Sequence, residues 1–468
     1  MSAIINLSVG IQSAATPRTS FGIPLILDFE NAQVSGAGAP VIGTYSSLAE
    51  MVADGWKTYH SAYKLAAALC AQQPRPAVFK VAGMATGVAA DDLDDIVAED
   101  SDWWMILATT RTAAQIKAIA SWVEAASSRC AYLGCTNDAA AKAAGVSVLS
   151  ELFSAGRMRT AMVYQAPTVQ EVRLYFDKLL VDAAVGPPAT NANTFDCKVN
   201  DTSIAQQTFA VSHNNTLTAI AAALAGTAAV ATATVHASAD APLGANNDYI
   251  KLTAASALVD MLISDIVVAQ GSQQASVRIE EYTPSSIPVD AAWCGKVLPH
   301  DPGSATWAHK TLSGPAADTL TTAQRGYIQV QRGNWYSTEL GFAITFPGTC
   351  SKESSPGTPY YIDQVQLADA IESELQTGLM DILNRSKKIP YTDQGVAMLL
   401  AEFKKVEDKY VASGALVKKS FDDSYTIPSV ASQAAGDVSS RIFRGLQASW
   451  QTSGGIHVVA DFVVSLQA

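Results

Sequence analysis

The sequence has 468 residues, of which 49% are hydrophobic and only 16% are charged, and its formal net charge is -12. Soluble domains usually contain about 25% charged residues, so this chain has unusually little charge for its surface. The negative charge argues against a nucleic-acid binder, because phosphate contacts need clustered Lys and Arg. The apolar content argues against a disordered chain. We expect about two to four folded domains that cover much of their surface with partner subunits.

The lack of a secretory signal pattern and the spacing of the cysteines predict a protein made in the cytoplasm. The N-terminus has neither the basic segment nor the apolar core of a secretory signal. The long uncharged run over 216–239 consists mainly of Ala and Thr, so we expect a short helix and a strand there, with no membrane insertion. The cysteines lack C-x-x-C spacing, which favours buried free thiols. They are Cys70, Cys130, Cys135, Cys197, Cys294 and Cys350.

Both ends of the chain have the alternation of apolar and polar residues that is typical of strands. Near the N-terminus the apolar positions are Ile5, Leu7, Val9 and Ile11. A Ser/Thr/Pro stretch over 13–20 follows as a tether, so residues 1–20 are predicted to form an arm. In the C-terminal segment 455–468 the apolar positions on one face include Ile456, Val458, Phe462 and Val464. These patterns predict strand-like N- and C-terminal arms.

The region between 21 and 165 alternates between strand and helix patterns. This order predicts an α/β layered domain with a largely parallel sheet. The predicted strands cover 21–29, 77–81, 103–108, 130–134 and 159–164. The predicted helices cover 48–53, 59–71, 91–102, 113–126 and 138–144.

The composition changes after Tyr164. Residues 169–180 have a helical pattern, and residues 190–285 are rich in Thr, Val, Asn and Ser. Short strands are predicted at 194–199, 207–211, 229–237, 248–253, 266–270 and 275–282, with one helix at 217–224. We interpret this stretch as a small β-rich module.

An α/β pattern returns after Pro288. Two long amphipathic helices are predicted over 363–384 and 392–413, and the second ends at Gly414. Its outer face is predicted to hold Lys404, Lys405, Glu407, Asp408 and Lys409. Strands are predicted over 441–450 and 456–466.

No common motif for catalysis, nucleotide binding or metal binding is present. Ser304 lies near His300, Asp301 and His309, but it is placed in a Pro-Gly turn without a nucleophile elbow. The carboxylates over 91–102 lack the central Gly of a calcium loop and are better explained as a solvated helix start. We therefore predict no enzyme activity, no catalytic residue, no cofactor and no metal.

Several stretches in the C-terminal part resemble the contractile tail sheath proteins of bacteriophages. They are 290–295, 298–310 with 312–314, 334–336, 361–363, 388–395 and 454–457. The resemblance is good over 288–468 and weaker over 21–165, and it is missing over 166–287. It therefore implies a discontinuous α/β sheath core, 21–165 plus 288–468, with an inserted outward-facing β-rich domain at 166–287.

The resemblance implies a structural subunit in the virion tail, made in the host bacterial cytoplasm. Such subunits form stacked hexameric rings around a tail tube and contract to drive the tube through the host envelope. The implied partners are other copies of the chain, the tube protein, and baseplate and tail terminator proteins, with no nucleic acid. The sheath of a phage-derived contractile injection particle is an alternative that the sequence does not separate. A second alternative is an adhesin that binds host glycans through 166–287, although aromatic residues are sparse there.

The resemblance also implies roles for particular residues. The terminal arms would add strands to neighbouring subunits, which makes Ile5, Leu7, Val9, Ile11, Ile456, Val458, Phe462 and Val464 the candidates for exchange. The alternative is that both strands complete the sheets of their own chain. The C-terminal core would face the tube, with Lys387, Lys388, Lys404, Lys405 and Lys409 as candidate contacts. The alternative for these lysines is a solvated helix surface.

Overall fold

The computed structural model describes residues 4–5, 20–30, 42–84, 86–126, 130–176, 194–208, 213–236, 248–269 and 277–457. The chain divides into two compact units. The first contains 1–47, 68–165 and 289–468, and the second contains 48–67 and 166–288. The sequence assigned 48–67 to the core, whereas the structure groups this segment with the second unit. The predicted mixture of helices and strands is confirmed, and among the described helices none is long and apolar enough to cross a bilayer.

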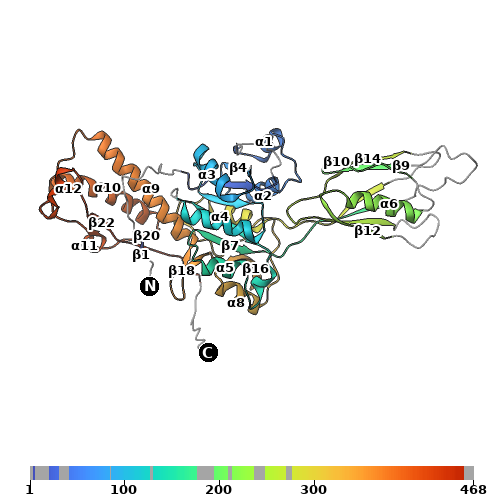
Figure 1. The fold of residues 1–468 in the computed structure, drawn as a ribbon. Coiled ribbons are helices and arrows are strands. Elements are labelled where there is room, and N and C mark those ends of the chain that lie inside the picture. The colour runs from blue at the N-terminus through green and yellow to red at the C-terminus, as the bar shows by residue number, and fades with distance from the viewer. Residues whose placement is uncertain are drawn as a thin grey trace, which may run out of the picture. The chain divides into compact units, whose positions relative to one another are not determined.

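An eight-stranded sheet forms the centre of the first unit, in the order β17-β16-β7-β6-β5-β2-β4-β3 (Figure 1). The six strands from β16 to β4 are parallel, and the two edge strands are antiparallel to their neighbours. The inner strands are buried on both faces, which explains why they read as continuous apolar runs. The strands are β2 Pro24–Asp28, β3 Ile42–Tyr45, β4 Phe79–Gly83, β5 Met105–Ala108, β6 Ala131–Thr136, β7 Thr160–Tyr164, β16 Asn334–Glu339 and β17 Phe342–Phe346.

Asn334 fixes the position at which the first unit's chain returns to this sheet. β16 lies parallel to β7, with Asn334 opposite Val163. The fully buried Asn334 amide donates to the carbonyls of Met162 and Thr349, each at 2.9 Å. Its Oδ1 accepts from the backbone N–H groups of Gly348 and Thr349, each at 2.8 Å. One side chain therefore joins β7, β16 and the start of β18, and all of its hydrogen-bonding capacity is used.

Helices cover the sheet of the first unit. They are α3 Ala89–Glu99, α4 Ala113–Ala125, α5 Val148–Ser154, α7 Val289–Val297 and α8 Thr322–Val330. In α7, Asp290 is fully buried and pairs with Arg111, its Oδ2 lying 2.9 Å from Nη2. The predicted helix over 138–144 is only a 3-10 turn, Ala139–Lys142. The α-helix begins instead at Val148, where Ser147 and Ser150 form a capping box.

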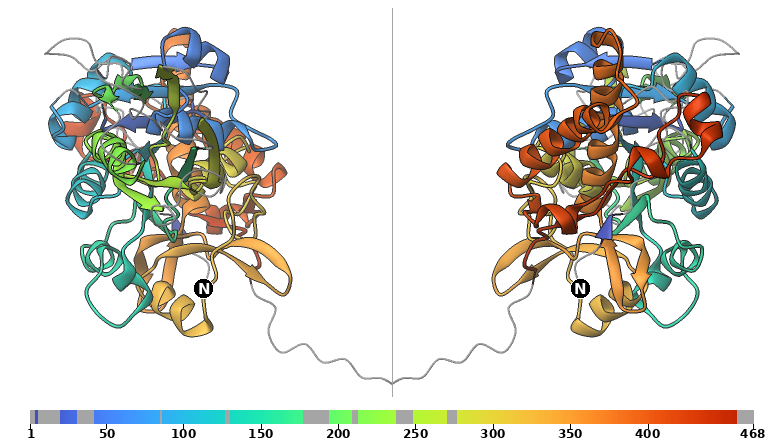
Figure 2. Two further views of the ribbon diagram at one scale, coloured as in Figure 1. Left: turned by 90° about the vertical axis from the view of Figure 1, so that its right-hand side faces the viewer. Right: turned by 90° about the vertical axis from the view of Figure 1, so that its left-hand side faces the viewer.

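The C-terminal part of the first unit is built on a helical hairpin. A short hairpin, β18 Thr349–Ser355 and β19 Thr358–Tyr361, leads into α9 Ile362–Arg385, which is followed by α10 Asp393–Ala412. The two long helices, drawn in orange, lie side by side and antiparallel (Figures 1 and 2). Smaller elements follow: β20 Leu416–Val417, α11 Phe421–Ser424, β21 Tyr425–Thr426, a 3-10 turn Val430–Ser432, α12 Ala435–Ser439, β22 Gln447–Ala448 and β23 Trp450–Thr452.

A buried ion pair attaches α9 to the eight-stranded sheet. Arg159, next to β7, holds Asp369 of α9 with two hydrogen bonds, Nη1 to Oδ2 at 2.7 Å and Nη2 to Oδ1 at 2.6 Å. Trp104 Nε1 donates to the same carboxylate at 2.9 Å. The Arg159 and Asp369 side chains are only 7% and 1% exposed. Burial alone would lower the pKa of Arg159, but the Asp369 carboxylate raises it above its ordinary value.

The second unit has two four-stranded sheets, and helix α6 packs with them around its core. One sheet has the order β12-β13-β8-β15, and in the other β9 pairs with β10, β11 and β14. Helix α6, His213–Ala225, contributes Leu217, Ile220 and Leu224 to the core, which it shares with both sheets (Figure 1). The strands are β8 Glu171–Phe176, β9 Thr194–Val199, β10 Thr202–Ser203, β11 Gln207–Thr208, β12 Val230–His236, β13 Tyr249–Ala254, β14 Ile263–Ala269 and β15 Val277–Thr283.

The helix predicted over 169–180 is wrong for its described part. Residues 171–176 form β8, which lies between β13 and β15 in antiparallel pairing. Val172, Leu174 and Phe176 point into the core, while the residues between them are half-buried. This period of two belongs to a strand, and a central strand satisfies its backbone groups through both neighbours.

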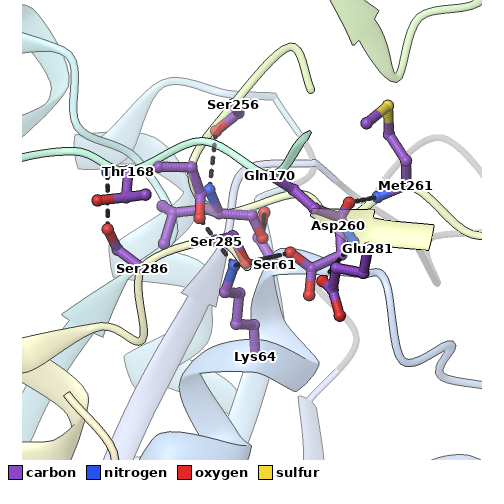
Figure 3. Close-up of polar contacts among 12 residues, drawn as sticks. Ser61, Lys64, Thr168, Gln170, Ser256, Asp260, Met261, Glu281, Ser285 and Ser286 are labelled. Atoms are coloured by element: carbon purple, nitrogen blue, oxygen red, sulfur yellow. Dashed lines mark hydrogen bonds and ion pairs between the residues drawn. The ribbon is translucent and has the colours of Figure 1, made fainter. Parts of the chain in front are cut away.

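Buried polar contacts attach residues 48–67 to the rest of the second unit. This segment contains α1 Leu48–Ala53 and the first part of α2 Ser61–Cys70. Lys64 Nζ donates to the carbonyl of Ala257 at 2.8 Å and to Asp260 Oδ1 at 2.9 Å, and it also bonds Ser285 Oγ (Figure 3). Burial lowers the pKa of Lys64, although Asp260 works in the opposite direction. The Lys64 contacts explain why 48–67 belongs to this unit.

Removing the charge of Asp369 should destabilise the first unit strongly. Asp369→Asn leaves the Arg159 guanidinium buried without its counter-charge, and a loss of this kind costs about 3–5 kcal/mol. Asp381→Asn is the matched control, because Asp381 lies on the same helix and pairs with Arg385 at the surface, where the side chains are 43% and 78% exposed. We expect the control to lose about 0.3–0.5 kcal/mol in urea unfolding. Equal losses of stability in the two variants would contradict a special role for the buried Arg159–Asp369 pair.

Lys64→Met should selectively destabilise the second unit. The variant removes the donor for Ala257 and the partner of Asp260, and we expect a loss of about 1–3 kcal/mol. Lys57→Met is the control, because Lys57 and Asp201 are 55% and 56% exposed and their charged atoms lie 3.9 Å apart. Hydrogen exchange followed by peptide mass spectrometry would locate the effect. A loss of protection confined to the first unit would overturn the interpretation.

Candidate interaction surface

Segments from the N-terminal and C-terminal parts of the chain meet in a small sheet whose edges are short strands. Its order is β1-β23-β20, where β1 is Ile4–Ile5. Ile5 is opposite Trp450, and Val417 of β20 is opposite Gln451 on the other side of β23. All pairings are antiparallel. Edge strands present unpaired backbone groups, which makes them the natural sites for the addition of another strand.

This terminal sheet stands on the core of the α9–α10 hairpin. Trp450 and Leu416 are 4% and 3% exposed and belong to one apolar cluster with residues of both helices. The helical members are Leu367, Ala370, Ile371, Leu375, Leu379, Phe403, Val406 and Tyr410. The edge strands of the terminal sheet are therefore short, whereas its central strand, β23, is anchored in a packed core through Trp450.

Glu407 of α10 attaches the neighbouring two-stranded β21–β22 sheet to the helical hairpin. Its carboxylate is 3% exposed and accepts a hydrogen bond from Tyr425 Oη at 2.6 Å. Burial and the contact with Glu407 raise the pKa of Tyr425 above its ordinary value. The prediction that Glu407 lies on the outer face of its helix is wrong, because the residues after the helix fold back over it. No local pattern in the sequence indicated that the Tyr425 hydroxyl would supply the hydrogen bond that allows the Glu407 carboxylate to be buried.

The candidate exchange residues fall partly outside the described residues. Ile5 lies in β1 and pairs with its own chain, whereas Leu7, Val9 and Ile11 lie outside the described residues. Ile456 is 84% exposed and is not part of a strand. Val458, Phe462 and Val464 also lie outside the described residues. The single predicted strand over 441–450 is replaced by β22 and β23, which belong to different sheets.

After β23, the chain contacts residues 306–309 and Tyr361 through His457. The His457 ring lies 2.6 Å from Thr306 Oγ1 through Nε2, and its backbone carbonyl accepts from His309 Nε2 at 2.8 Å. The ring of Tyr361 meets the His457 ring edge to face at 4.9 Å. We call Thr306, His309 and Tyr361 the histidine socket. The resemblance over 298–310, 361–363 and 454–457 covers this socket, but sequence spacing could not bring the three stretches together.

The five candidate tube-facing lysines are exposed but differ in their contacts. Lys405 pairs with Glu402 at 2.7 Å, and Lys409 pairs with Glu374 of α9. Lys404 Nζ lies 4.7 Å from the centre of the Phe421 ring. Lys387 and Lys388 lie in the turn between α9 and α10. The turn lysines are therefore separated from the three on α10, which are already engaged within the chain.

Ser304 and the cysteines have structural environments that fit the sequence interpretation. Ser304 Oγ donates to the Asp301 carbonyl at 2.6 Å within a turn, and His309 is used by the histidine socket. All six cysteines are unpaired thiols. Burial raises the pKa of Cys135 to about 12, so this thiol stays protonated and unreactive at neutral pH. Among the described residues, no cluster of His, Cys, Asp or Glu could hold a metal ion.

Comparisons with known proteins agree with this architecture. Residues 362–426, which run from α9 to β21, match the family described as "E217 tail sheath protein gp31-like, C-terminal domain". A search of curated proteins gives no match. Among solved structures, the chain is similar to the sheath complex of an extracellular contractile injection system, PVC, in the contracted state. The TM-score is 0.50 and the identity 10%, with 100% of this chain and 97% of the other covered.

A second solved structure, the anti-feeding prophage (AFP) baseplate in the contracted state, is 11% identical. The alignment covers 99% of this chain and 97% of the other, with a TM-score of 0.47. At such identities a structural likeness concerns the fold, whereas the family match concerns the sequence of the α9–α10 hairpin itself. The resemblance to contractile tail sheath proteins is therefore confirmed by the family match over residues 362–426.

Proposed function

We propose that this chain is the structural subunit of a contractile tail sheath. Copies of the chain would form stacked hexameric rings around a tail tube, and contraction would drive the tube through the host envelope. The partners are then other copies of the chain, the tube protein, and the baseplate and tail terminator proteins of the same particle. The family match over 362–426 carries this proposal.

The terminal sheet supports assembly by strand addition. Its edge strands β1 and β20 have two residues each, and β23 between them is anchored by Trp450. An arm that adds to such an edge gains backbone hydrogen bonds, while its alternating side chains set the register. A contact between an arm and the sheet of another copy is heterologous, so it continues from subunit to subunit into an open helical array.

The energy for contraction would be stored in contacts between subunits. A bias of about 5.5 kcal/mol moves a two-state equilibrium from 1:99 to 99:1, and modest differences between two interfaces can supply it. The buried Arg159–Asp369 and Arg111–Asp290 pairs keep the first unit together. Subunits would then rotate as rigid bodies while their arms stay connected.

Phage tails and headless contractile particles use the same class of subunit, and the proposal covers both. The adhesin alternative is disfavoured by the aromatic residues of the second unit. The guanidinium of Arg173 lies 3.2 Å from the centre of the Tyr282 ring, and that of Arg278 lies 4.2 Å from the centre of the Tyr175 ring. One face of each ring is therefore already occupied by an arginine, which leaves less ring surface for stacking a sugar.

The first test is whether the purified chain polymerises through its N-terminal arm. We expect hollow cylinders in negative-stain micrographs of the natural chain. Ile4→Pro combined with Ile5→Pro removes the backbone donors of β1 and should abolish the cylinders while leaving a folded monomer. The control Ala15→Pro changes the Ser/Thr/Pro tether and should keep them. A natural chain that stays monomeric would overturn the proposed function, and cylinders from the Ile4/Ile5 variant would overturn the role of the arm.

The second test concerns the tube. Lys387→Glu combined with Lys388→Glu reverses two charges in the α9–α10 turn, and we expect co-sedimentation with the tube protein to weaken severalfold without loss of self-assembly. Exposed charges act through water, so added salt should reduce the difference. The double variant Lys57→Glu and Lys117→Glu is the control for net charge, because both lysines are exposed. Equal weakening by both double variants would contradict a specific tube contact.

A further inference from the structure

The histidine socket holds the last described residue of the chain from three directions. Thr306 meets the ring of His457 through its hydroxyl, His309 donates to the His457 backbone carbonyl, and Tyr361 packs against the ring. Gly455 also approaches closely, since a Cβ atom there would lie 3.3 Å from Thr306 Cβ. Residues 458–468 follow directly, so the socket fixes the point from which the C-terminal segment departs.

The socket is itself fixed to the eight-stranded sheet. The backbone N–H of His309 donates to the Thr345 carbonyl of β17 at 2.7 Å, and Thr345 N donates to the Lys310 carbonyl at 3.0 Å. Thr345 Oγ1 further donates to the Trp307 carbonyl at 2.9 Å. The segment 306–310 therefore extends the sheet edge, and a change in contact with His457 does not require the core to move.

The surroundings favour a neutral imidazole at His457. Its Nδ1 is buried and has no hydrogen-bond partner among the described residues. A protonated ring carries N–H on both nitrogens, so Nδ1–H would lack an acceptor. Burial lowers the pKa of His457, and the nearby charges of His309 and Lys310 lower it further. Protonation should therefore expel the ring from the socket.

We propose that His457 is a proton-sensitive latch, docked in the socket while its ring is neutral and released when the ring takes up a proton. The proposal rests on the proposed function, because it concerns the base of the C-terminal arm. At neutral pH the latch holds residue 457, where the arm begins, against the sheet edge. In mildly acidic surroundings the arm loses this attachment, and the contacts between subunits that depend on it weaken.

The direction of the pH dependence follows from linkage. A free histidine has a pKa of about 6.5, and the docked ring has a lower one, so the released state binds more protons. Docking is complete above about pH 6.5 and weakens as the pH falls toward the lowered value. If the docked ring takes up no proton, docking weakens by up to about tenfold between pH 7.5 and 5.5.

Other titratable groups also lie near His457, and the effect of each on the pH dependence has to be considered separately. Burial lowers the pKa of Lys310 and raises that of Tyr361. Burial raises the pKa of Asp363, at the start of α9, to about 6. Its protonation favours the folded state as the pH falls, which is the opposite sign. His309 is the remaining group, and its Nε2 donates to the His457 carbonyl.

Nuclear magnetic resonance of the full chain labelled at histidine Cε1 tests the latch directly. The His457 signal, identified by its loss in His457→Gln, should titrate with a midpoint below about 6.5. A midpoint at or above that value would overturn the proposal. Asp363→Asn should leave the His457 signal titrating below this value, because the two effects are separate.

Sedimentation of assembled sheath at pH 7.5 and 5.5 tests the consequence. We expect the natural chain to lose assembly by up to about tenfold at the lower pH. His457→Gln should assemble equally at both values, because glutamine can still bond Thr306 but takes up no proton. The control His300→Gln changes an exposed histidine and should keep the natural profile. Equal pH dependence in the natural chain and in His457→Gln overturns the latch alone, whereas a natural chain that never assembles overturns the proposed function.

Discussion

The attachment of α9 to the eight-stranded sheet through Arg159 and Asp369 is the constraint on which the C-terminal architecture depends. The pair is almost fully buried, and Trp104 satisfies a further acceptor site of the carboxylate. Removal of two charges from water is costly, so the pair persists only because both groups are held in one geometry. Helix α9 then supports α10, and the two helices support the terminal sheet through Trp450. A shift of α9 would therefore displace every candidate contact surface in this part of the chain.

The first unit combines a buried central sheet with a small terminal sheet whose short strands can form or open easily. The central strands of the large sheet are paired on both sides and buried, whereas β1, β20 and β23 contain only two or three residues. Few backbone hydrogen bonds hold such short strands, so they can form or open without disturbing the core. The proposed sheath function would use this combination, because the body of the subunit would move as one piece while its connections survive. The histidine socket would add a chemical control at one of these connections.

The sequence predicted an element correctly where its local periodicity of apolar residues agreed with its burial in the folded chain. The alternation of strand and helix before Tyr164 predicted the parallel sheet. The apolar period located both ends of α9 and of α10 to within one residue. The prediction failed where a distant segment supplied the partner. Residues 171–176 look helical until β13 and β15 are placed on either side of them. Glu407 looks exposed until Tyr425 folds over it, and Asp369 interrupts an apolar helix face without any local sign of Arg159.

The sequence by itself determined the α/β class of this protein and its resemblance to tail sheath proteins, because periodicity and motif identity are carried by neighbouring residues. Only the tertiary structure decided that 48–67 joins the second unit, that β1 pairs with β23, and that Thr306, His309 and Tyr361 form one socket around His457. These outcomes depend on hydrogen bonds and charge pairs between segments that are tens to hundreds of residues apart. Such contacts are selected by the packing of the whole chain, and no local pattern records them.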